Sequence, residues 1–325
     1  MPINWFPGHM HATARAIKER MAAGLDVVVE LLDARLPGSS CNPLLASLTA
    51  GRPSLKVLNK QDLADPAQTA AWLDCYNAQP DTRALPLDAG ERSPARLITR
   101  ACRELAPCRG ELHKPLRVLI CGIPNVGKST LINTLAGKRA AKTGDEPGIT
   151  KTEQKIVLEP GFYLFDTPGM LWPRIAVAQS GYHLAASGAI GRNAFDEAEV
   201  ALELVAVLAR RYPERLRQRY GLAELGGPGG EEAVLEAIGL KRGAKVRGGA
   251  VQMHKAAEAL LMDFRQGLLG RITLETPEEM AGWRRAAAED EARQAAAREA
   301  ARQADKARRS GRRRDDAADA GDAGT

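Results

Sequence analysis

The sequence predicts an α/β fold with a mainly parallel sheet, followed by a C-terminal helical domain. In the first half of the chain, short apolar runs that end in polar loops alternate with helical segments. Beyond about residue 178 the strand-like runs stop and only helical patterns remain. We therefore expect an α/β domain at residues 1–177, an all-helical domain at residues 178–283, and a low-complexity, disordered and charged tail at residues 284–325.

The elements of the predicted fold follow in chain order. An amphipathic helix is expected at residues 8–24, because apolar side chains recur at helical spacing and Gly24 can cap its end. Buried parallel strands read as short, β-branched apolar runs, and the chain contains several of them. These runs lie at residues 26–37, 54–62, 84–90, 116–122 and 155–169, and the other helical segments lie at residues 66–77, 93–105, 196–212, 231–239 and 248–270.

Composition limits the class of protein. The 325 residues are 44% hydrophobic, enough for a folded chain of about two domains. The formal net charge of +6 favours a polyanionic partner such as nucleic acid. Five scattered cysteines without CxxC spacing indicate neither a zinc site nor a disulfide framework. No apolar run approaches the length of a membrane span, so we expect a cytoplasmic protein with no membrane partner.

A phosphate-binding loop follows the strand at residues 116–122. The stretch GIPNVGKS matches GxxxxGK[ST] between a strand and a helix, which is the context that this motif requires. Its backbone N–H groups would wrap the phosphates of a nucleotide, Lys128 would neutralise the β- and γ-phosphates, and Ser129 would bind Mg²⁺. The nucleotide-binding residues predicted here are Asn125, Val126, Gly127, Lys128, Ser129 and Thr130.

Two further motifs complete the expected phosphate side. The stretch DTPG places Asp166 at a strand end, where it would hold Mg²⁺ through water, and the Gly169 N–H would sense the γ-phosphate. By itself this stretch is also an ordinary turn sequence. Thr150 lies between the two motifs and is expected to supply a second hydroxyl ligand to Mg²⁺.

The tetrapeptide NKQD, residues 59–62, is typical of a loop that selects guanine. The Asp62 carboxylate would accept both N–H donors of guanine, a pair that adenine lacks. Asn59 would brace the site, and the stem of Lys60 would cover the base. A second loop, Asp88-Ala89-Gly90, would add a backbone N–H to guanine O6, although Asp88 stands where a serine is usual.

The order of these motifs along the chain is unusual, because NKQD precedes the phosphate loop. Binding depends on where the loops lie in space, so a sheet tolerates this order if its former termini are joined, here near residues 107–114. The sequence therefore predicts a circularly permuted P-loop GTPase, a three-layer sandwich, that hydrolyses GTP to GDP and phosphate.

Several motifs resemble the ribosome biogenesis GTPase A family. They are the permuted order, WFPGHM at residues 5–10, DARLPGSSCNP at 33–43 and GGAVQMHKAAEALLMDFRQGLLG at 248–270. The resemblance spans about residues 1–277. It implies a GTPase that assists late assembly of the large (50S) ribosomal subunit, binds its rRNA through the helical domain, and has a slow intrinsic rate that the ribosome stimulates.

Hydrolysis needs a group that orients the attacking water. Small GTPases use a glutamine directly after DxxG, and Met170 occupies that position here. The resemblance implies His9 as the replacement; a helix-start position would keep its imidazole neutral. An ordinary helix-start histidine, or His11, is the alternative. The catalytic residues expected are His9, Lys128, Thr150 and Gly169.

Asn125 matches the asparagine with which potassium-activated GTPases bind a monovalent cation. A K⁺ ion there would replace an arginine finger. The simpler interpretation is that Asn125 only caps its loop. Asp33 and Arg35 also lie near the expected site, where a structural ion pair and a functional role are equally consistent with the sequence.

RNA contacts are expected from basic residues beside glycines in the helical domain, although such clusters are often only solvated surface. The residues are Lys241, Arg242, Lys245 and Arg247. Three other functions stay open: a P-loop ATPase or kinase, which Asp62 opposes; an RNA-binding scaffold with vestigial hydrolysis; and a permuted GTPase that acts on another RNA or ribosomal target.

Overall fold

The structure is a computed structural model that describes residues 9–88, 94–135, 154–222, 225, 229–244 and 251–319. The chain divides into two compact units, Met1–Met280 and Ala281–Thr325. The first unit holds the sheet and the helical bundle. In the described ranges, no helix is long and apolar enough to cross a membrane.

Within the described residues, six strands form one sheet in the order β3-β2-β1-β4-β6-β5. All neighbours are parallel except β5, which pairs antiparallel with β6. The predicted α/β fold with a mainly parallel sheet is confirmed. The strands are β1 (Val27–Asp33), β2 (Ser54–Asn59), β3 (Thr82–Pro86), β4 (Leu116–Gly122), β5 (Gln154–Glu159) and β6 (Phe162–Asp166).

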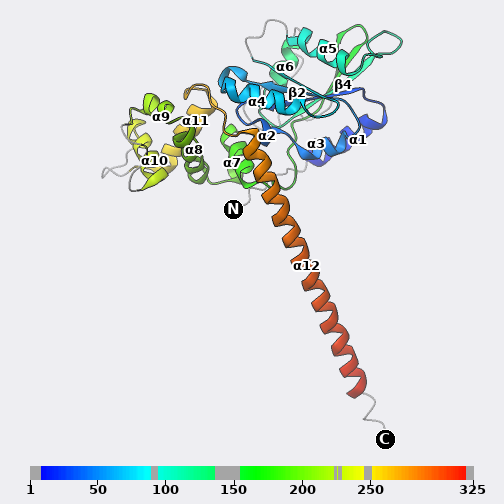
Figure 1. Cartoon of the computed structure of the whole chain (residues 1–325), viewed down its shortest axis with the longest axis vertical. Coiled ribbons are helices and arrows are strands. Elements are labelled where there is room, and N and C mark those ends of the chain that lie inside the picture. Colours follow the sequence, from blue (N-terminus) through cyan, green and yellow to red (C-terminus); the bar gives the residue numbers. More distant parts are fainter. Residues whose placement is uncertain are drawn as a thin grey trace. The chain divides into compact units, whose positions relative to one another are not determined.

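The centre of the sheet is built from the most apolar segments of the chain. Every residue of β1 is buried, and in β4 only Arg117 is exposed. Such continuous burial is expected of parallel strands that helices cover on both faces. In Figure 1, α5 (Pro94–Leu105) and α6 (Lys128–Leu135) lie above the sheet. The helices α1 (His9–Ala22) and α3 (Pro43–Leu48) lie below it.

Two short helices begin at clear sequence signals. The Asn42 side chain accepts hydrogen bonds from the N–H groups of Leu44 and Leu45 and so caps α3. The Asp65 side chain caps α4 (Pro66–Asn77) in the same way, and each helix has proline at its first position. A single turn, α2 (Pro37–Ser40), connects β1 to the start of α3.

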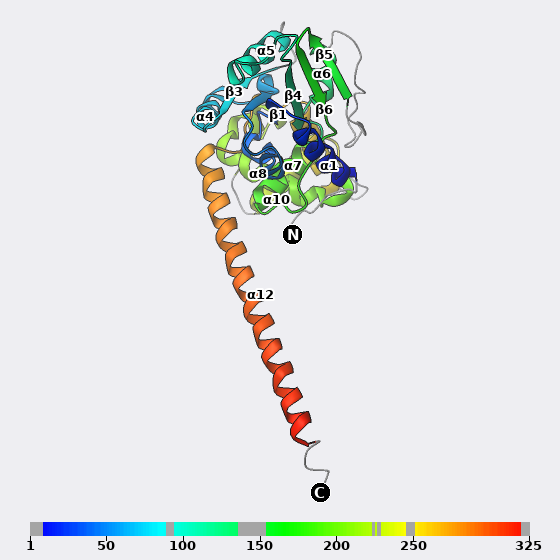
Figure 2. The same ribbon diagram turned by 90° about the vertical axis from the view of Figure 1, so that its right-hand side faces the viewer.

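The helical bundle has its own apolar core. Leu204, Leu208, Leu235, Leu260 and Phe264 all lie in that core. Figure 1 shows these helices grouped beside the sheet domain, and in Figure 2, turned by 90°, they overlap it along the line of sight. The bundle consists of α7 (Ala178–Ser187), α8 (Glu197–Arg211), α9 (Pro213–Tyr220), α10 (Gly230–Lys241) and α11 (Met253–Arg265).

The C-terminal segment is helical over most of its length. Beyond residue 283 we expected a frayed helix that passes into a disordered tail, and the structure has a helix, α12 (Pro277–Asp319), there. The segment lacks the bulky apolar residues that a core needs, and this made disorder the expected state. Alanine, glutamate, arginine and glutamine, however, are strong helix formers, so the same composition supports a solvated helix.

Candidate active site

The candidate site lies where β1, β2, β4 and β6 deliver their carboxyl-terminal loops, as parallel sheets favour. The NKQD loop follows β2 and the phosphate loop follows β4, and these two strands flank β1 on either side. Two hydrogen bonds join the loops. Asn59 Nδ2 donates to the Val126 carbonyl at 2.8 Å, and Lys60 Nζ donates to the Asn125 carbonyl at 2.9 Å. Motifs that are far apart in the sequence therefore form one continuous surface.

The backbone of both loops is held in unusual conformations. Lys60 and Asn125 have φ of 63° and 58°, in the left-handed region that few non-glycine residues adopt. Gly127 has φ of 94°, and a Cβ atom built there would lie 2.4 Å from Asn59 Nδ2. Position 127 therefore needs glycine both for its conformation and for the contact between the loops.

Lys128 and Asp166 form a buried ion pair at the centre of the phosphate side. Lys128 is the first residue of α6 and Asp166 is the last residue of β6, and both side chains are almost fully buried. Because buried charges are costly without a partner, each of the two side chains depends on the other in this position. A bound phosphate would offer Lys128 a second anionic partner in the same place.

The residues at this point fit a magnesium ion. Ser129 is the second residue of α6, Asp166 ends β6, and the strands that lead to them, β4 and β6, are neighbours. A hydroxyl and a carboxylate oxygen are the ligand types that Mg²⁺ prefers. The third expected ligand, Thr150, lies outside the described residues.

The loop after Asp166 packs directly against the phosphate loop. A Cβ atom on Gly169 would lie 3.0 Å from Pro124 Cα, and Met170 N–H donates to the Gly122 carbonyl at 3.0 Å. Met170 itself is buried. The loop that is expected to sense the γ-phosphate is therefore in backbone contact with the loop that would bind it.

The expected base side is more open. Asp62 is exposed, as a carboxylate that receives a base must be before binding. Gln61 links the two base loops, because its Nε2 donates to Asp88 Oδ2 at 3.2 Å and its N–H donates to the Leu87 carbonyl at 3.0 Å. Ala89 and Gly90 lie outside the described residues.

Other predicted residues are placed less completely. His9 is the first residue of α1, but its side chain lies outside the described part of the chain, as do Lys245 and Arg247. Lys241 is exposed at the end of α10. Arg242 Nη2 donates to Asp263 Oδ1 at 3.2 Å, so this arginine also balances a fully buried carboxylate within the bundle.

The structure brings three residues to the site that the sequence prediction did not include. Asp33 Oδ2 accepts from Lys60 Nζ at 2.9 Å, and Arg35 pairs with Asp33. Burial alone would raise the pKa of Asp33, but Arg35 and Lys60 hold that pKa well below its usual value. Asn42 Nδ2 donates to the Met170 carbonyl at 2.8 Å. The Asn-Pro pair at residues 42–43 signals a helix cap, but no local pattern indicates the contact with Met170.

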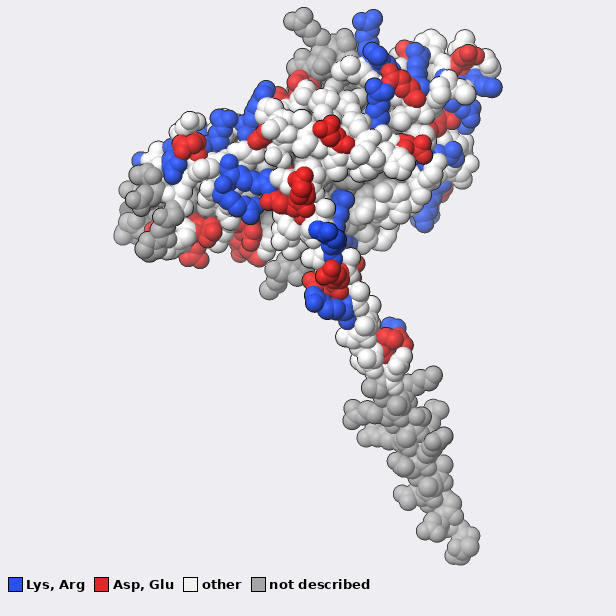
Figure 3. All heavy atoms as spheres, in the orientation of Figure 1, with Lys and Arg blue, Asp and Glu red and all other residues white. Residues whose placement is uncertain are grey.

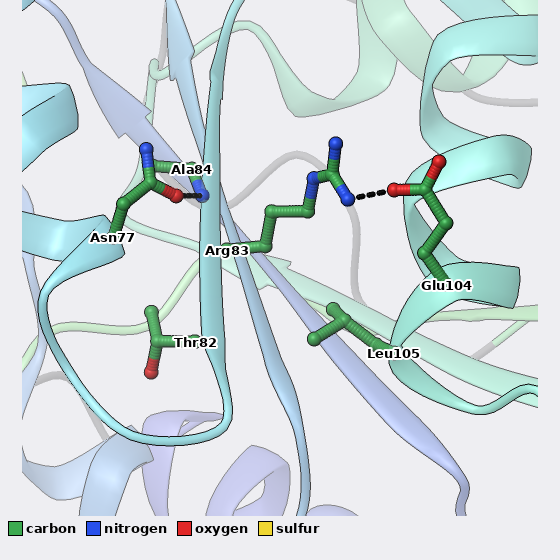
Figure 4. Close-up of a pocket in the computed structure, with 6 residues that line it drawn as sticks. All are labelled: Asn77, Thr82, Arg83, Ala84, Glu104 and Leu105. Atoms are coloured by element: carbon green, nitrogen blue, oxygen red, sulfur yellow. Dashed lines mark hydrogen bonds and ion pairs between the residues drawn. The ribbon is translucent and has the colours of Figure 1, made fainter.

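A separate pocket of about 500 Å³ lies away from this site. It is lined by Thr82 and Arg83 at the start of β3 and by Glu104 and Leu105 at the end of α5 (Figure 4). The amino-terminal ends of the strands lie at the opposite edge of the sheet from the motif loops. Arg83 and Glu104 form an ion pair across the pocket, and none of the residues that line it belongs to the nucleotide loops.

Comparison with known proteins agrees with this geometry. A sequence model described as a 50S ribosome-binding GTPase matches residues 117–223. Ribosome biogenesis GTPase A of Bacillus cereus is 41% identical over 86% of this chain and 95% of its own. The chain belongs to the ribosome biogenesis GTPase A family. The expected P-loop GTPase fold and GTP-hydrolysing activity are thereby confirmed at the level of the family.

More distant relatives and solved structures extend the family match. Mitochondrial ribosome-associated GTPase 1 of Xenopus tropicalis is 32% identical over 84% of this chain and 94% of its own. A GDP-bound YlqF structure is 26% identical, with a TM-score of 0.57 over 81% of this chain and 100% of that one. The GNP-bound YlqF of T. maritima gives a TM-score of 0.56 over 81% and 97% of the two chains.

Proposed function

We propose that this chain is a cytoplasmic assembly factor for the large ribosomal subunit that binds rRNA and switches on GTP hydrolysis. One observation supports it above the others: the guanine-type loop and the phosphate loop are braced together by Asn59 and Lys60 in a chain of this family. The end of α7 contacts the phosphate loop through Gly188, and Arg271, after α11, contacts the NKQD loop at the Asp62 carbonyl. Such contacts suit a protein whose nucleotide state is communicated to a large partner.

The binding step follows from the described residues. The N–H groups at the start of α6 and the Lys128 ammonium would hold the β- and γ-phosphates, and Asp62 would select guanine. Ser129 and Asp166, with Thr150, would hold Mg²⁺, which neutralises phosphate charge when it is bound. Asn59 and Lys60 would keep the base loop at a fixed distance from the phosphates.

Water activation needs a residue other than the one directly after DTPG. Met170 cannot orient water, so we assign that task to His9, with Gly169 sensing the γ-phosphate. His9 begins α1, and its neighbour Met10 is fully buried in the core of the sheet domain. The backbone at His9 is therefore anchored to the sheet domain. Ribosome binding would bring the imidazole to the attacking water.

A potassium ion is the second proposed activator. Asn125 Nδ2 donates to the Gly188 carbonyl at 2.8 Å, so the amide is oriented through its nitrogen, and Oδ1 is the atom a cation would use. Hydrolysis should then be faster in K⁺ than in Na⁺ at equal ionic strength. Equal rates in the two salts would remove the cation from the mechanism.

The deciding experiment measures GTP turnover in K⁺ buffer, with and without purified large ribosomal subunits. Wild type, His9→Ala and the matched control His11→Ala would be compared. We expect strong stimulation that His9→Ala loses and His11→Ala keeps. Absence of stimulation would move the proposal to another RNA partner, and stimulation retained by His9→Ala would remove His9 alone.

The proposed RNA contact has its own test. Basic and acidic side chains alternate over the face drawn in Figure 3, and Arg211 and Arg217 pair with Glu279 and Glu214, so much of the charge is compensated. Lys241, which is exposed, offers the cleaner probe. The logarithm of the rRNA binding constant should fall linearly with the logarithm of salt concentration, and Lys241→Ala should reduce the magnitude of that slope by about one. Affinity that is constant across moderate salt would contradict phosphate contacts.

A further inference from the structure

We propose that Asp33 and Arg35 are positioning residues for guanine-nucleotide binding. Through them, the nucleotide affinity depends on how the helical bundle packs against the nucleotide loops. The inference rests on the proposed nucleotide site. It goes beyond that site by assigning a task to an ion pair outside the predicted nucleotide-binding residues, and by making the bundle part of the binding equilibrium.

The first step is the contact between Asp33 and the base loop. Asp33 ends β1 and is almost fully buried, and its Oδ2 accepts from Lys60 Nζ at 2.9 Å. Lys60 also donates to the Asn125 carbonyl, so one ammonium group joins the base loop, β1 and the phosphate loop. Lys60 has a strained backbone φ of 63°. Its hydrogen bonds to Asp33 and Asn125 fix the position of its side chain.

The second step joins Asp33 to the bundle. Arg35 donates from Nε to Asp33 Oδ1 at 2.9 Å and from Nη2 to Asp33 Oδ2 at 2.8 Å. The third nitrogen, Nη1, donates to the Phe264 carbonyl of α11 at 3.0 Å, and the guanidinium lies 4.7 Å above the Phe264 ring. The planar guanidinium therefore fixes the orientation of Asp33 with respect to the end of α11.

A second connection reaches the phosphate loop. Asn125 Nδ2 donates to the Gly188 carbonyl at the end of α7. Arg265 of α11 donates to the Ala185 and Ala186 carbonyls of α7, each at 2.9 Å. The chain of contacts is thus closed: it runs from Lys60 through Asp33 and Arg35 to α11, then through α7 and Asn125 back to Lys60.

The segment after α11 completes the connection through backbone bonds. Ile272 N–H donates to the Leu63 carbonyl at 2.9 Å, and Leu274 N–H donates to the Arg35 carbonyl at 2.7 Å. This segment therefore pairs with the residues that directly follow NKQD and with Arg35 itself. A shift of the bundle would act on both sides of Lys60 at once.

Linkage sets the direction of the effect. If nucleotide binding requires Lys60 in this position, a bound nucleotide must also stabilise the packing of the bundle against the nucleotide loops, by the same coupling free energy. A partner that displaces the bundle would then weaken nucleotide binding. The rival interpretation is a purely structural ion pair, whose loss lowers stability and leaves the affinity unchanged.

The neighbouring pair of Glu30 and Lys56 provides a matched control. Glu30 lies in the same strand as Asp33, is equally buried, and pairs with Lys56 at 2.5 Å. The Glu30 carboxylate contacts Lys56, Cys41 and Asn42, none of which belongs to loop 59–62. Glu30→Gln and Asp33→Asn are the same chemical change, three residues apart.

The experiment measures the Kd of N-methylanthraniloyl-GDP for the full chain by fluorescence, together with the single-turnover hydrolysis rate of bound GTP. We expect Asp33→Asn to weaken binding about tenfold, the loss of a charge-assisted hydrogen bond, while Glu30→Gln leaves Kd unchanged. The single-turnover rate should change less than Kd in the Asp33 variant. Arg35→Lys keeps the positive charge but loses the paired hydrogen bonds to Asp33, so it should weaken GDP binding less than Asp33→Asn does.

A second variant covers the case in which Asp33→Asn does not fold. Asp33→Asn combined with Arg35→Met removes both buried charges together, a change that proteins often tolerate. It should weaken GDP binding as the single variant does. GDP should also slow amide hydrogen exchange in residues 271–275 of wild type but not of the double variant.

The outcomes separate this inference from the proposed function. Unchanged Kd in folded Asp33 variants, beside a wild type that binds GDP, would overturn the positioning role alone. Protection of residues 271–275 that is equal in wild type and the double variant would overturn the coupling. A wild type that binds no guanine nucleotide would overturn the proposed function, and this inference with it.

Discussion

Gly127 shows how closely single residues define the site. Its φ of 94° excludes most side chains, and a Cβ atom would displace the Asn59 amide that joins the two loops. A similar dependence holds at Lys60 and Asp33, where one ammonium and one carboxylate connect segments from both sides of β1. We therefore expect a small displacement of any one of these side chains to break a contact between the base loop and the phosphate loop.

Gly127→Ala should weaken GDP binding at least about tenfold, because the new methyl group must push Asn59 from the Val126 carbonyl. Gly51→Ala is the matched control, since Gly51 also has positive φ, 77°, but nothing lies within 4 Å of its Cβ position. Both variants should lose some thermal stability from backbone strain. Equal GDP affinity in the two variants would show that the Asn59 brace does not matter.

The lowered pKa of Asp33 predicts a dependence of stability on pH. Because the folded-state pKa lies below the unfolded value, Asp33 stabilises the fold fully at neutral pH, and this contribution is lost as pH falls below about 4. Denaturant titrations of wild type and Asp33→Asn at pH 3 to 7 would measure it. Their difference in unfolding free energy should shrink as the solution becomes more acidic; a constant difference would mean that Asp33 is not the titrating group.

At the scale of elements, the sequence predicted the strands and most helices well, because apolar runs and periodicity are local signals. It also placed the motifs at the correct strand ends. The Asn42 contact with Met170 and the Arg35 contact with α11 were not predictable, since they join residues 128 and 229 positions apart. The extent of the C-terminal helix was not predictable for a different reason: composition does not distinguish a solvated helix such as α12 from disorder.

Asn42→Ser should separate helix capping from the contact with the DTPG loop. Serine still caps α3, so the start of the helix should be kept, but serine cannot reach the Met170 carbonyl as the amide does. The loss of this buried hydrogen bond should lower the free energy of unfolding by about 1 to 3 kcal/mol. We expect single-turnover hydrolysis to slow several-fold. Asp196→Ser, the corresponding change at the cap of α8, is the control and should hydrolyse GTP at the wild-type rate.

At the scale of the whole molecule, permutation places the bundle immediately after the DTPG loop, and the fold then returns it to the base loop. The bundle contacts the phosphate loop at Gly188, and through Ile272 the segment after α11 contacts Leu63, which directly follows the base loop. A GTPase arranged in this way has two contacts through which its nucleotide state and its partner can influence one another. All of this depends on residues 59–62 and the phosphate loop forming one guanine site.

The affinity of Asp62→Asn for GTP and for xanthosine triphosphate tests that claim most directly. Xanthine has a carbonyl where guanine has an amine, so an asparagine amide should accept xanthine and reject guanine. We predict that GTP affinity falls by about a hundredfold or more while xanthosine triphosphate affinity rises. If Asp62→Asn kept the affinity of the wild type for GTP and gained none for xanthosine triphosphate, NKQD would not be the base-reading loop of this site.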